Sequence, residues 1–338
     1  MRIDVHAHYF PESLVKLLVK LGRSDIAFIG GQSSDFAPRL AELDATHTDC
    51  QILSAVGLDI QVPNRDDSVK VARYINDVYK EVYEAHGGRF RAFGWIPLPF
   101  VTEAIAEVRR CLDDLGFVGI AMPCAYANRT LDDPEFEGLW VELSNRAAVV
   151  YIHPVGMQSA CHWGLKDYGL HTAYGSPLQL ALTAHRLVWS GLTQRHARIR
   201  FIFAVLGGYL PFFWPRILRN VRRGLEDSAV EAVGPNFFSW MKKLPIDPKD
   251  PMAEFRRFYY DTSTQDMPLA LLCAKQAFGT SQILLGSDEI FASLREAVTY
   301  IEQSEYLTPE EKSAILDRNA QALLHLPERT PGKTRASA

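Results

Sequence analysis

Two histidines, His6 and His8, stand two positions apart near the start of the chain, within a short and largely apolar run. Side chains alternate between the two faces of a strand, so in an extended conformation these two imidazoles point the same way. Two imidazole nitrogens directed at one point form a pair of ligands for Zn²⁺ or a similar ion. An HxH pattern also arises by chance, and ten histidines in the chain leave that alternative open.

Two further candidate ligands follow short apolar runs later in the chain. His153 ends the fifth such run and Asp288 ends the eighth. Taken singly, His153 is also consistent with a buried structural histidine, and Asp288 with the N-cap of the helix that follows. Taken together with His6 and His8, they predict a single site for a divalent metal if the ends of their strands meet. His153 and Asp288 are then candidate catalytic groups as well as metal ligands.

Eight β-rich runs separated by helix-like segments would position these residues. Several runs lack polar alternation, which is typical of a parallel strand covered on both sides. The runs are residues 2–5, 50–56, 90–96, 117–122, 149–152, 200–205, 258–261 and 283–287. Eight strands alternating with helices predict a (β/α)8 TIM barrel, in which the carboxyl ends of all strands surround one mouth where catalytic groups gather. In that fold the four candidate ligands converge.

The chain has 338 residues, more than the ~250 that such a barrel typically needs. We assign the surplus to insertions near residues 10–48, directly after the first strand, and 227–251, where prolines punctuate the chain. Residues 1–327 are therefore expected to form one barrel domain, and residues 328–338 a flexible tail. A doubly wound open sheet is the alternative, but no GxGxxG motif follows the first strand.

Composition and charge exclude several classes of function. The chain has 36 basic and 40 acidic residues and a net charge of −4, so it lacks the positive field that a nucleic-acid partner requires. No apolar run approaches the ~20 residues of a membrane-spanning helix. The five cysteines are scattered without a CxxC pair, which is typical of reduced thiols. We therefore expect a cytoplasmic protein with neither a nucleic-acid nor a membrane partner.

The sequence resembles the amidohydrolase superfamily, and within it the branch of aminocarboxymuconate semialdehyde decarboxylase and related aromatic-acid decarboxylases. The resemblance covers about residues 3–326 and is carried by IDVHAHYFP at 3–11, IHP at 152–154, GGYLP at 207–211 and LGSD at 285–288. It implies a (β/α)8 barrel that holds one divalent metal through His6, His8, His153 and Asp288. Zn²⁺ is the first expectation and Mn²⁺ the alternative. The resemblance also implies a homodimer.

The fourth β-rich run indicates one metal rather than two. Members of the superfamily with two metals bridge them with a carboxylated lysine on the fourth strand. The corresponding run here, residues 117–122, contains no lysine, and none occurs between Lys80 and Lys166. We therefore expect a mononuclear site.

Val205 departs from the family pattern. The sixth strand of the family ends in a histidine directly before the glycines, and Val205 occupies that place. Valine has no polar atom and cannot move a proton. His162, His171 and Glu289 are candidates for the missing catalytic function. The alternatives are that the ion suffices without the histidine, or that the chain binds metal with impaired catalysis.

The candidate substrate-binding residues are Arg216, Trp163 and Phe291. Arg216 stands where family members place an arginine that reaches a substrate carboxylate, sometimes across a dimer interface. A solvated helix arginine is the alternative for Arg216, and core packing is the alternative for the two aromatic residues. The resemblance thus implies a metal-dependent decarboxylase of a small aromatic or unsaturated carboxylic acid. A hydrolase or hydratase on the same barrel is the alternative.

Overall fold

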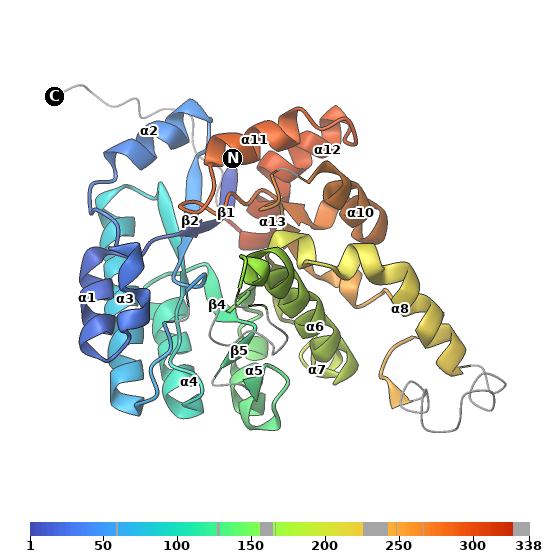
Figure 1. The fold of residues 1–338 in the computed structure, drawn as a ribbon, viewed down its shortest axis with the longest axis horizontal. Coiled ribbons are helices and arrows are strands. Elements are labelled where there is room, and N and C mark those ends of the chain that lie inside the picture. The colour runs from blue at the N-terminus through green and yellow to red at the C-terminus, as the bar shows by residue number, and fades with distance from the viewer. Residues whose placement is uncertain are drawn as a thin grey trace.

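The centre of the molecule is a sheet of parallel strands, described here from a computed structural model (Figure 1). The structure describes residues 1–58, 60–126, 129–155, 165, 167–225, 243–247, 249–265 and 267–326. Within these residues, eight strands pair in the order β1-β2-β3-β4-β7-β8-β9-β10. They are β1 (Ile3–His8), β2 (Cys50–Ser54), β3 (Phe90–Gly94), β4 (Gly119–Pro123), β7 (Val149–His153), β8 (Arg200–Phe203), β9 (Tyr259–Asp261) and β10 (Ile283–Leu284).

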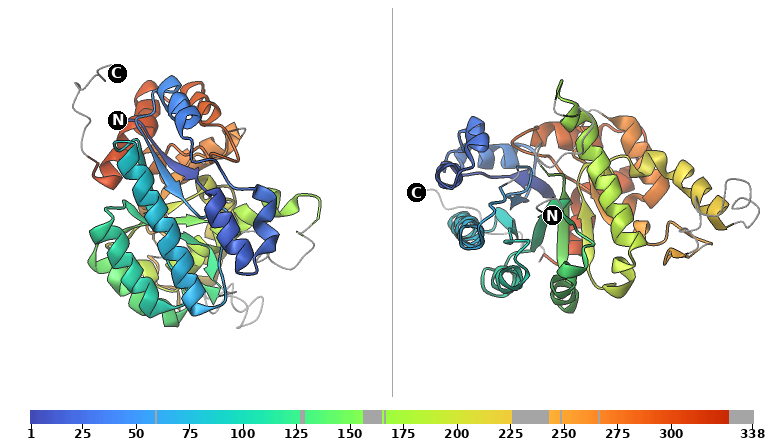
Figure 2. Two further views of the ribbon diagram at one scale, coloured as in Figure 1. Left: turned by 90° about the vertical axis from the view of Figure 1, so that its left-hand side faces the viewer. Right: turned by 60° about the horizontal axis from the view of Figure 1, so that its bottom comes forward.

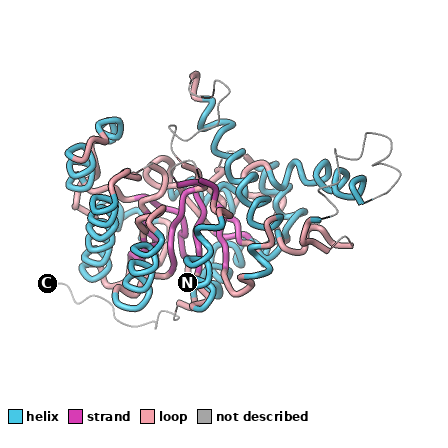
Figure 3. The backbone as a smooth tube through the Cα atoms, turned by 90° about the horizontal axis from the view of Figure 1, so that it is seen from below, coloured by secondary structure: helices cyan, strands magenta, loops and turns pink. Residues whose placement is uncertain are grey.

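The segment that follows β10 returns to β1. The N–H of Val5 donates to the carbonyl of Leu285 (2.9 Å), and the N–H of Asp288 donates to the carbonyl of His6 (2.8 Å). Ala7 also forms a parallel bridge with Glu289. These contacts join the two ends of the sheet, so the predicted (β/α)8 barrel is confirmed. Figure 3 shows the strands at the centre with helices around them.

Helices cover the outside of the barrel (Figure 2). They are α1 (Glu12–Lys20), α2 (Ala37–Ala45), α3 (Arg65–Ala85), α4 (Val101–Arg109), α5 (Glu137–Asn145), α6 (Ser176–Trp189), α7 (Leu192–Arg195), α8 (Leu210–Leu225), α10 (Pro268–Phe278), α11 (Leu294–Glu302), α12 (Pro309–Ser313) and α13 (Asn319–Leu324). Short π-helical segments adjoin four of them: Arg110–Asp114 follows α4, His171–Gly175 precedes α6, and Ala314–Arg318 joins α12 to α13. A small antiparallel pair, β5 (Ala125–Tyr126) and β6 (Arg129–Thr130), lies after β4.

Local sequence explains where the longest helix begins and which face it buries. The side chain of Asn64 accepts a hydrogen bond from the N–H of Asp67 (3.1 Å) and so caps the first turn of α3. Val71, Ile75 and Val82 recur at helical spacing and are buried. The strands inside the helical layer follow a different rule: every residue of β1 is buried, as expected for a parallel strand covered on both faces.

Val205 lies outside the strand in which we expected it. Strand β8 ends at Phe203, and Val205 and Leu206 adopt left-handed backbone conformations with φ of 53° and 51°. A β-branched residue rarely takes this conformation, so contacts with distant residues must hold it there. The N–H of Val205 lies within hydrogen-bond distance of Asp261 Oδ1 (3.1 Å) and Ser263 Oγ (3.2 Å).

The segment between β1 and β2 forms α1, a 3-10 turn (Ser24–Ile29) and α2. Much of the segment 227–251, and the tail from residue 327 onward, lie outside the described residues. Within the part of the chain that the structure describes, no helix is both long and apolar enough to cross a membrane.

Candidate metal centre

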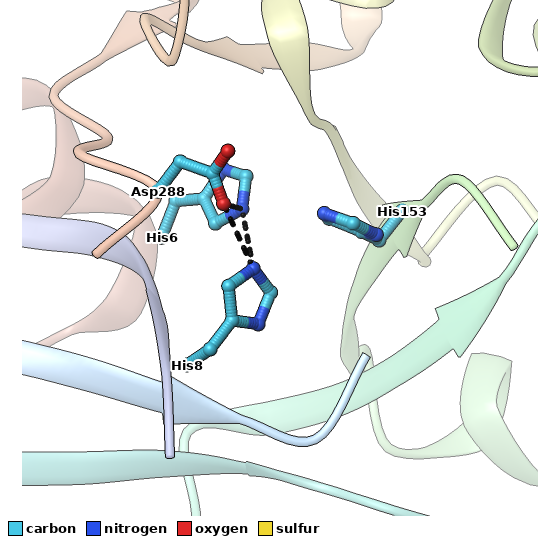
Figure 4. A group of neighbouring side chains, drawn as sticks. All are labelled: His6, His8, His153 and Asp288. Carbon is cyan, nitrogen blue, oxygen red and sulfur yellow. Dashed lines mark hydrogen bonds and ion pairs between the residues drawn. The ribbon is translucent and has the colours of Figure 1, made fainter. Parts of the chain in front are cut away.

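Four side chains meet at the carboxyl ends of the strands (Figure 4). His6 and His8 come from β1, His153 ends β7, and Asp288 lies beyond β10. One nitrogen or oxygen atom from each lies within 4.8 Å of the others. The structure therefore brings together all four residues that the sequence predicts as ligands, and His153 approaches from the side opposite to Asp288.

The spacing of the donor atoms suits a small divalent cation. His8 Nε2 lies 3.0 Å from Asp288 Oδ1, His6 Nε2 lies 3.3 Å from the same oxygen, and the two Nε2 atoms are 3.1 Å apart. Tetrahedral ligands bound at ~2.1 Å to Zn²⁺ would stand about 3.4 Å from one another. Three imidazole nitrogens and a carboxylate oxygen are also a donor set that Zn²⁺ and Mn²⁺ both accept.

Neighbouring groups contact the remaining ring nitrogens of His6 and His153. His6 Nδ1 lies 3.0 Å from Asp261 Oδ2, an oxygen that also accepts a hydrogen bond from the Tyr151 hydroxyl (2.9 Å). His153 Nδ1 lies 2.9 Å from the carbonyl of Pro154. Such contacts place the ring proton on Nδ1 and leave the Nε2 lone pair for a metal.

Asp261 is a functional candidate that the sequence reasoning missed. It ends the seventh β-rich run, as His153 and Asp288 end the fifth and the eighth, and this shared position was the available signal. Ser263 Oγ donates to the other Asp261 oxygen (2.6 Å), so the carboxylate is fully engaged.

Burial and neighbouring charge set the protonation of the cluster. Burial disfavours a charged His6, but the carboxylates of Asp261 and Asp288 outweigh it and raise the pKa of His6 to about 10. Burial, together with the charge of His6, lowers the pKa of His153 to about 3. The Asp288 carboxyl is also mostly buried, yet the nearby histidines lower its pKa. In the metal-free protein the His6 ring is therefore protonated on both nitrogens and positively charged, whereas the His153 ring is neutral. The site thus favours a positive charge.

A cavity of about 600 Å³ opens beside the cluster. Among the residues predicted from the sequence, His153, His171, Val205, Asp288 and Phe291 line it. The Asp288 side chain is 29% exposed, whereas His6 and His8 are fully buried, so Asp288 is the most accessible of the four.

Two predicted residues lie elsewhere. The Glu289 carboxylate accepts a hydrogen bond from Gln51 Nε2 (2.7 Å), and Glu289 is not among the described residues that line the cavity. Arg216 is exposed on α8 and is likewise not among the described residues that line the cavity of its own chain. His162 and Trp163 lie outside the described residues.

Known proteins resemble this chain over nearly its whole length. A profile of the family described as amidohydrolase matches residues 3–326. The 2-amino-3-carboxymuconate-6-semialdehyde decarboxylase of Dictyostelium discoideum is 26% identical over 96% of this chain and 92% of its own length.

Solved structures share the fold. A 2,6-dihydroxybenzoate decarboxylase complexed with 2,6-dihydroxybenzoate is similar with a TM-score of 0.74 and 22% identity, over 96% of this chain and 99% of its own. A 5-carboxyvanillate decarboxylase from Novosphingobium aromaticivorans, with bound manganese, is similar with a TM-score of 0.81 and 17% identity, over 96% of this chain and 97% of its own.

Proposed function

We propose that this chain, which belongs to the amidohydrolase family, is a metal-dependent decarboxylase of a small aromatic carboxylic acid. The observation that carries the proposal is the meeting of His6, His8, His153 and Asp288 beside a cavity of about 600 Å³. The names of its relatives support the choice of reaction, because the Dictyostelium relative and both structural neighbours are decarboxylases.

These four residues would hold one divalent cation, Zn²⁺ or Mn²⁺. When bound, the cation supplies Lewis-acid chemistry, drawing electron density from a substrate oxygen. Asp261 keeps the His6 ring in one orientation, and the Pro154 carbonyl does the same for His153. The buried side of the site excludes water around His6 and His8, and the cavity admits the substrate from the side of Asp288.

Decarboxylation breaks the bond between a ring carbon and the carboxyl carbon. Carbon dioxide leaves, the electron pair stays on the ring carbon, and that carbon takes up a proton. Val205 cannot deliver this proton, and the Glu289 side chain is directed elsewhere. We assign proton movement to Asp288 and to His171, which lines the cavity and whose Nε2 has no hydrogen-bond partner among the described residues. Burial lowers the pKa of His171, so its ring is neutral at rest; it would accept a proton from solvent and then pass that proton to the ring carbon as carbon dioxide leaves.

Apolar and aromatic side chains make up much of the cavity lining, alongside polar residues such as Arg23 and Thr264. Phe291 lines the cavity and its ring lies 5.4 Å from the His8 ring, an edge-on arrangement that suits a second aromatic ring. We propose Phe291 as a wall for the substrate ring. Trp163 remains a proposed wall residue from the sequence alone.

A second copy of the chain would complete the site. Arg216 is exposed on α8, which extends away from the barrel (Figures 1 and 2). We propose that the enzyme is a homodimer in which Arg216 meets the substrate carboxylate bound by the partner. Cys50, Cys111 and Cys124 are buried free thiols, which supports a reducing, cytoplasmic location.

The test is incubation of the metal-loaded protein with a panel of hydroxybenzoic and picolinate-type acids. We expect carbon dioxide from at least one acid, a product lighter by one carbon dioxide, and loss of both after chelation. The His153→Ala variant should lose the ion and the activity together. A product heavier by one water would instead identify a hydrolase or hydratase. A tightly bound ion without turnover of any acid would favour a non-catalytic metal-binding protein, as Val205 allows.

A further inference from the structure

Arg39 lies in helix α2, outside the barrel. Its side chain nevertheless reaches the mouth of the barrel, where the four proposed ligands lie. Its Nη2 donates a hydrogen bond to the carbonyl oxygen of His8 (2.9 Å), and its Nε lies 3.6 Å from Glu289 Oε1. The Arg39 side chain is only 10% exposed. A charged side chain in this position connects the insertion after β1 to two residues of the rim, one a proposed ligand and the other adjacent to one.

The contacts of Glu289 continue inward. Gln51 Nε2 donates both to Glu289 Oε2 (2.7 Å) and to Asp4 Oδ2 (2.8 Å). Asp4 in turn accepts hydrogen bonds from the Ser287 hydroxyl (2.6 Å) and the His6 N–H (3.1 Å). The network from Arg39 to Asp4 therefore contacts the backbone of His6 and His8 and holds the residues on both sides of Asp288.

We propose that Arg39 and Glu289 are positioning residues for the metal centre, and that their mostly buried ion pair lets helix α2 control how tightly the ion is held. The proposal rests on the metal site of the proposed function, but not on the reaction. Neither residue contacts the cavity, so both act through the ligands that they position.

The energetic reason lies in the burial of the pair. Removing one member of a buried ion pair leaves the other charge uncompensated, which costs far more than the loss of a surface pair. Loss of Arg39 would also remove the donor to the His8 carbonyl. Both effects shift ligands whose donor atoms must stay within a few tenths of an ångström to bind a cation well.

The same helix offers a matched control. Arg295 on α11 pairs with Glu42 on α2 at 2.9 Å, and its side chain is 59% exposed. The Arg295→Met variant removes an arginine ion pair that docks α2, but it touches neither Glu289 nor a proposed ligand. Comparison with Arg39→Met thus separates positioning of the ligands from general attachment of the helix.

The experiment measures the dissociation constant for Zn²⁺ and Mn²⁺ by competition with a chelator, in the wild type and in four variants. We expect Arg39→Met and Glu289→Gln each to weaken binding by about 10- to 100-fold. Arg295→Met should stay within about twofold of the wild type, because its pair is exposed. The double variant Arg39→Met/Glu289→Gln should bind no more weakly than Arg39→Met alone, because it leaves no uncompensated charge.

Equal losses in Arg39→Met and Arg295→Met, or losses that multiply in the double variant, would overturn the proposal. Glu289→Gln, which keeps the shape of the side chain, gives an independent reading if Arg39→Met fails to fold. Failure of the proposed metal site is distinguishable, because the wild type would then bind no ion at all. If the protein binds one ion but decarboxylates no acid, the metal affinities of the variants still test this proposal.

Discussion

At the scale of single residues, the four candidate ligands are closely spaced groups whose charges compensate one another. His6 carries the excess proton of the metal-free cluster, because the Asp261 and Asp288 carboxylates lie 3.0 and 3.3 Å from its two ring nitrogens. A cation that binds Nε2 must displace this proton, so folding, protonation and metal binding are coupled at this one ring.

We expect the metal-free protein to become less stable as the pH rises from about 7 to about 10. The pKa of His6 is about 10 in the folded protein, above the ~6.5 of an unfolded histidine. Its contribution to the free energy of unfolding is therefore complete below pH ~6.5 and is lost as the pH rises through about 10. Urea unfolding of the chelated protein at several pH values measures the effect.

Asp261→Asn provides the control for this prediction, because it removes a carboxylate that raises the pKa of His6. Its urea midpoint should depend less on pH than that of the wild type over the same range. Identical pH dependence in the two proteins would mean that other groups cause the loss of stability.

Val205 leads to a second prediction at this scale. Val205→His places an imidazole at the wall of the cavity, on backbone that histidine tolerates better than valine. A general acid or base typically contributes ~10²- to 10⁴-fold to a rate. We expect kcat for the acid that the wild type turns over best to rise within this range.

Val205→Asn separates the two effects of that substitution. Asparagine also tolerates the left-handed conformation, but it does not titrate. Both variants should be more stable than the wild type, because their new residues tolerate the left-handed backbone, but only Val205→His should raise kcat. Equal rates for the two variants would contradict a role in proton transfer.

At the scale of elements, the loop after β2 supports the ligand that β1 provides. Gly57 has a φ of 101°, and a Cβ atom there would lie 2.7 Å from His8 Cε1. The loop backbone thus packs directly against the His8 ring, and only glycine allows this approach.

Gly57→Ala should consequently weaken metal binding by pushing the His8 ring out of place. Gly116→Ala is the matched control, because Gly116 has a φ of 70° and a Cβ there would meet nothing within 4 Å. Both variants should lose about 1 kcal/mol or more of stability from backbone strain. Only Gly57→Ala should lower the affinity for the ion, as measured by chelator competition; parallel losses in both variants would rule out the contact.

At the scale of the whole molecule, helix α8 packs against α10 on one side and exposes aromatic side chains on another. Phe212 is 67% exposed on α8, and Phe213 beside it is also exposed. Two neighbouring exposed aromatic residues on a projecting helix are typical of a surface that pairs with another protein.

The double variant Phe212→Ser/Phe213→Ser should shift the molecule from dimer to monomer in light scattering, if α8 forms the proposed dimer contact. Arg216→Ala should leave the mass unchanged and raise KM, since it would remove a partner for the substrate carboxylate. Leu182→Ser, at another exposed apolar position, serves as the control and should leave both the mass and KM unchanged. A wild-type protein that is already monomeric would contradict the assignment.

The sequence by itself predicted the barrel and the four side chains that meet at the carboxyl ends of its strands. Apolar runs without polar alternation predict covered parallel strands, and the period of two residues in a strand directs His6 and His8 to one side. The carboxyl ends of barrel strands share one mouth, so the ends of the fifth and eighth runs place His153 and Asp288 there as well. These inferences need only local periodicity and the symmetry of a closed sheet.

Only the tertiary structure decided which neighbours direct those residues. Glu289 follows a proposed ligand in the sequence, yet its side chain is held by Gln51 and Arg39, from β2 and α2. Asp261 contacts His6 across more than 250 positions of the chain, and Val205 takes a conformation that its residue type disfavours. The direction of a side chain depends on backbone angles and on partners distant in the sequence, and neither is encoded in local pattern.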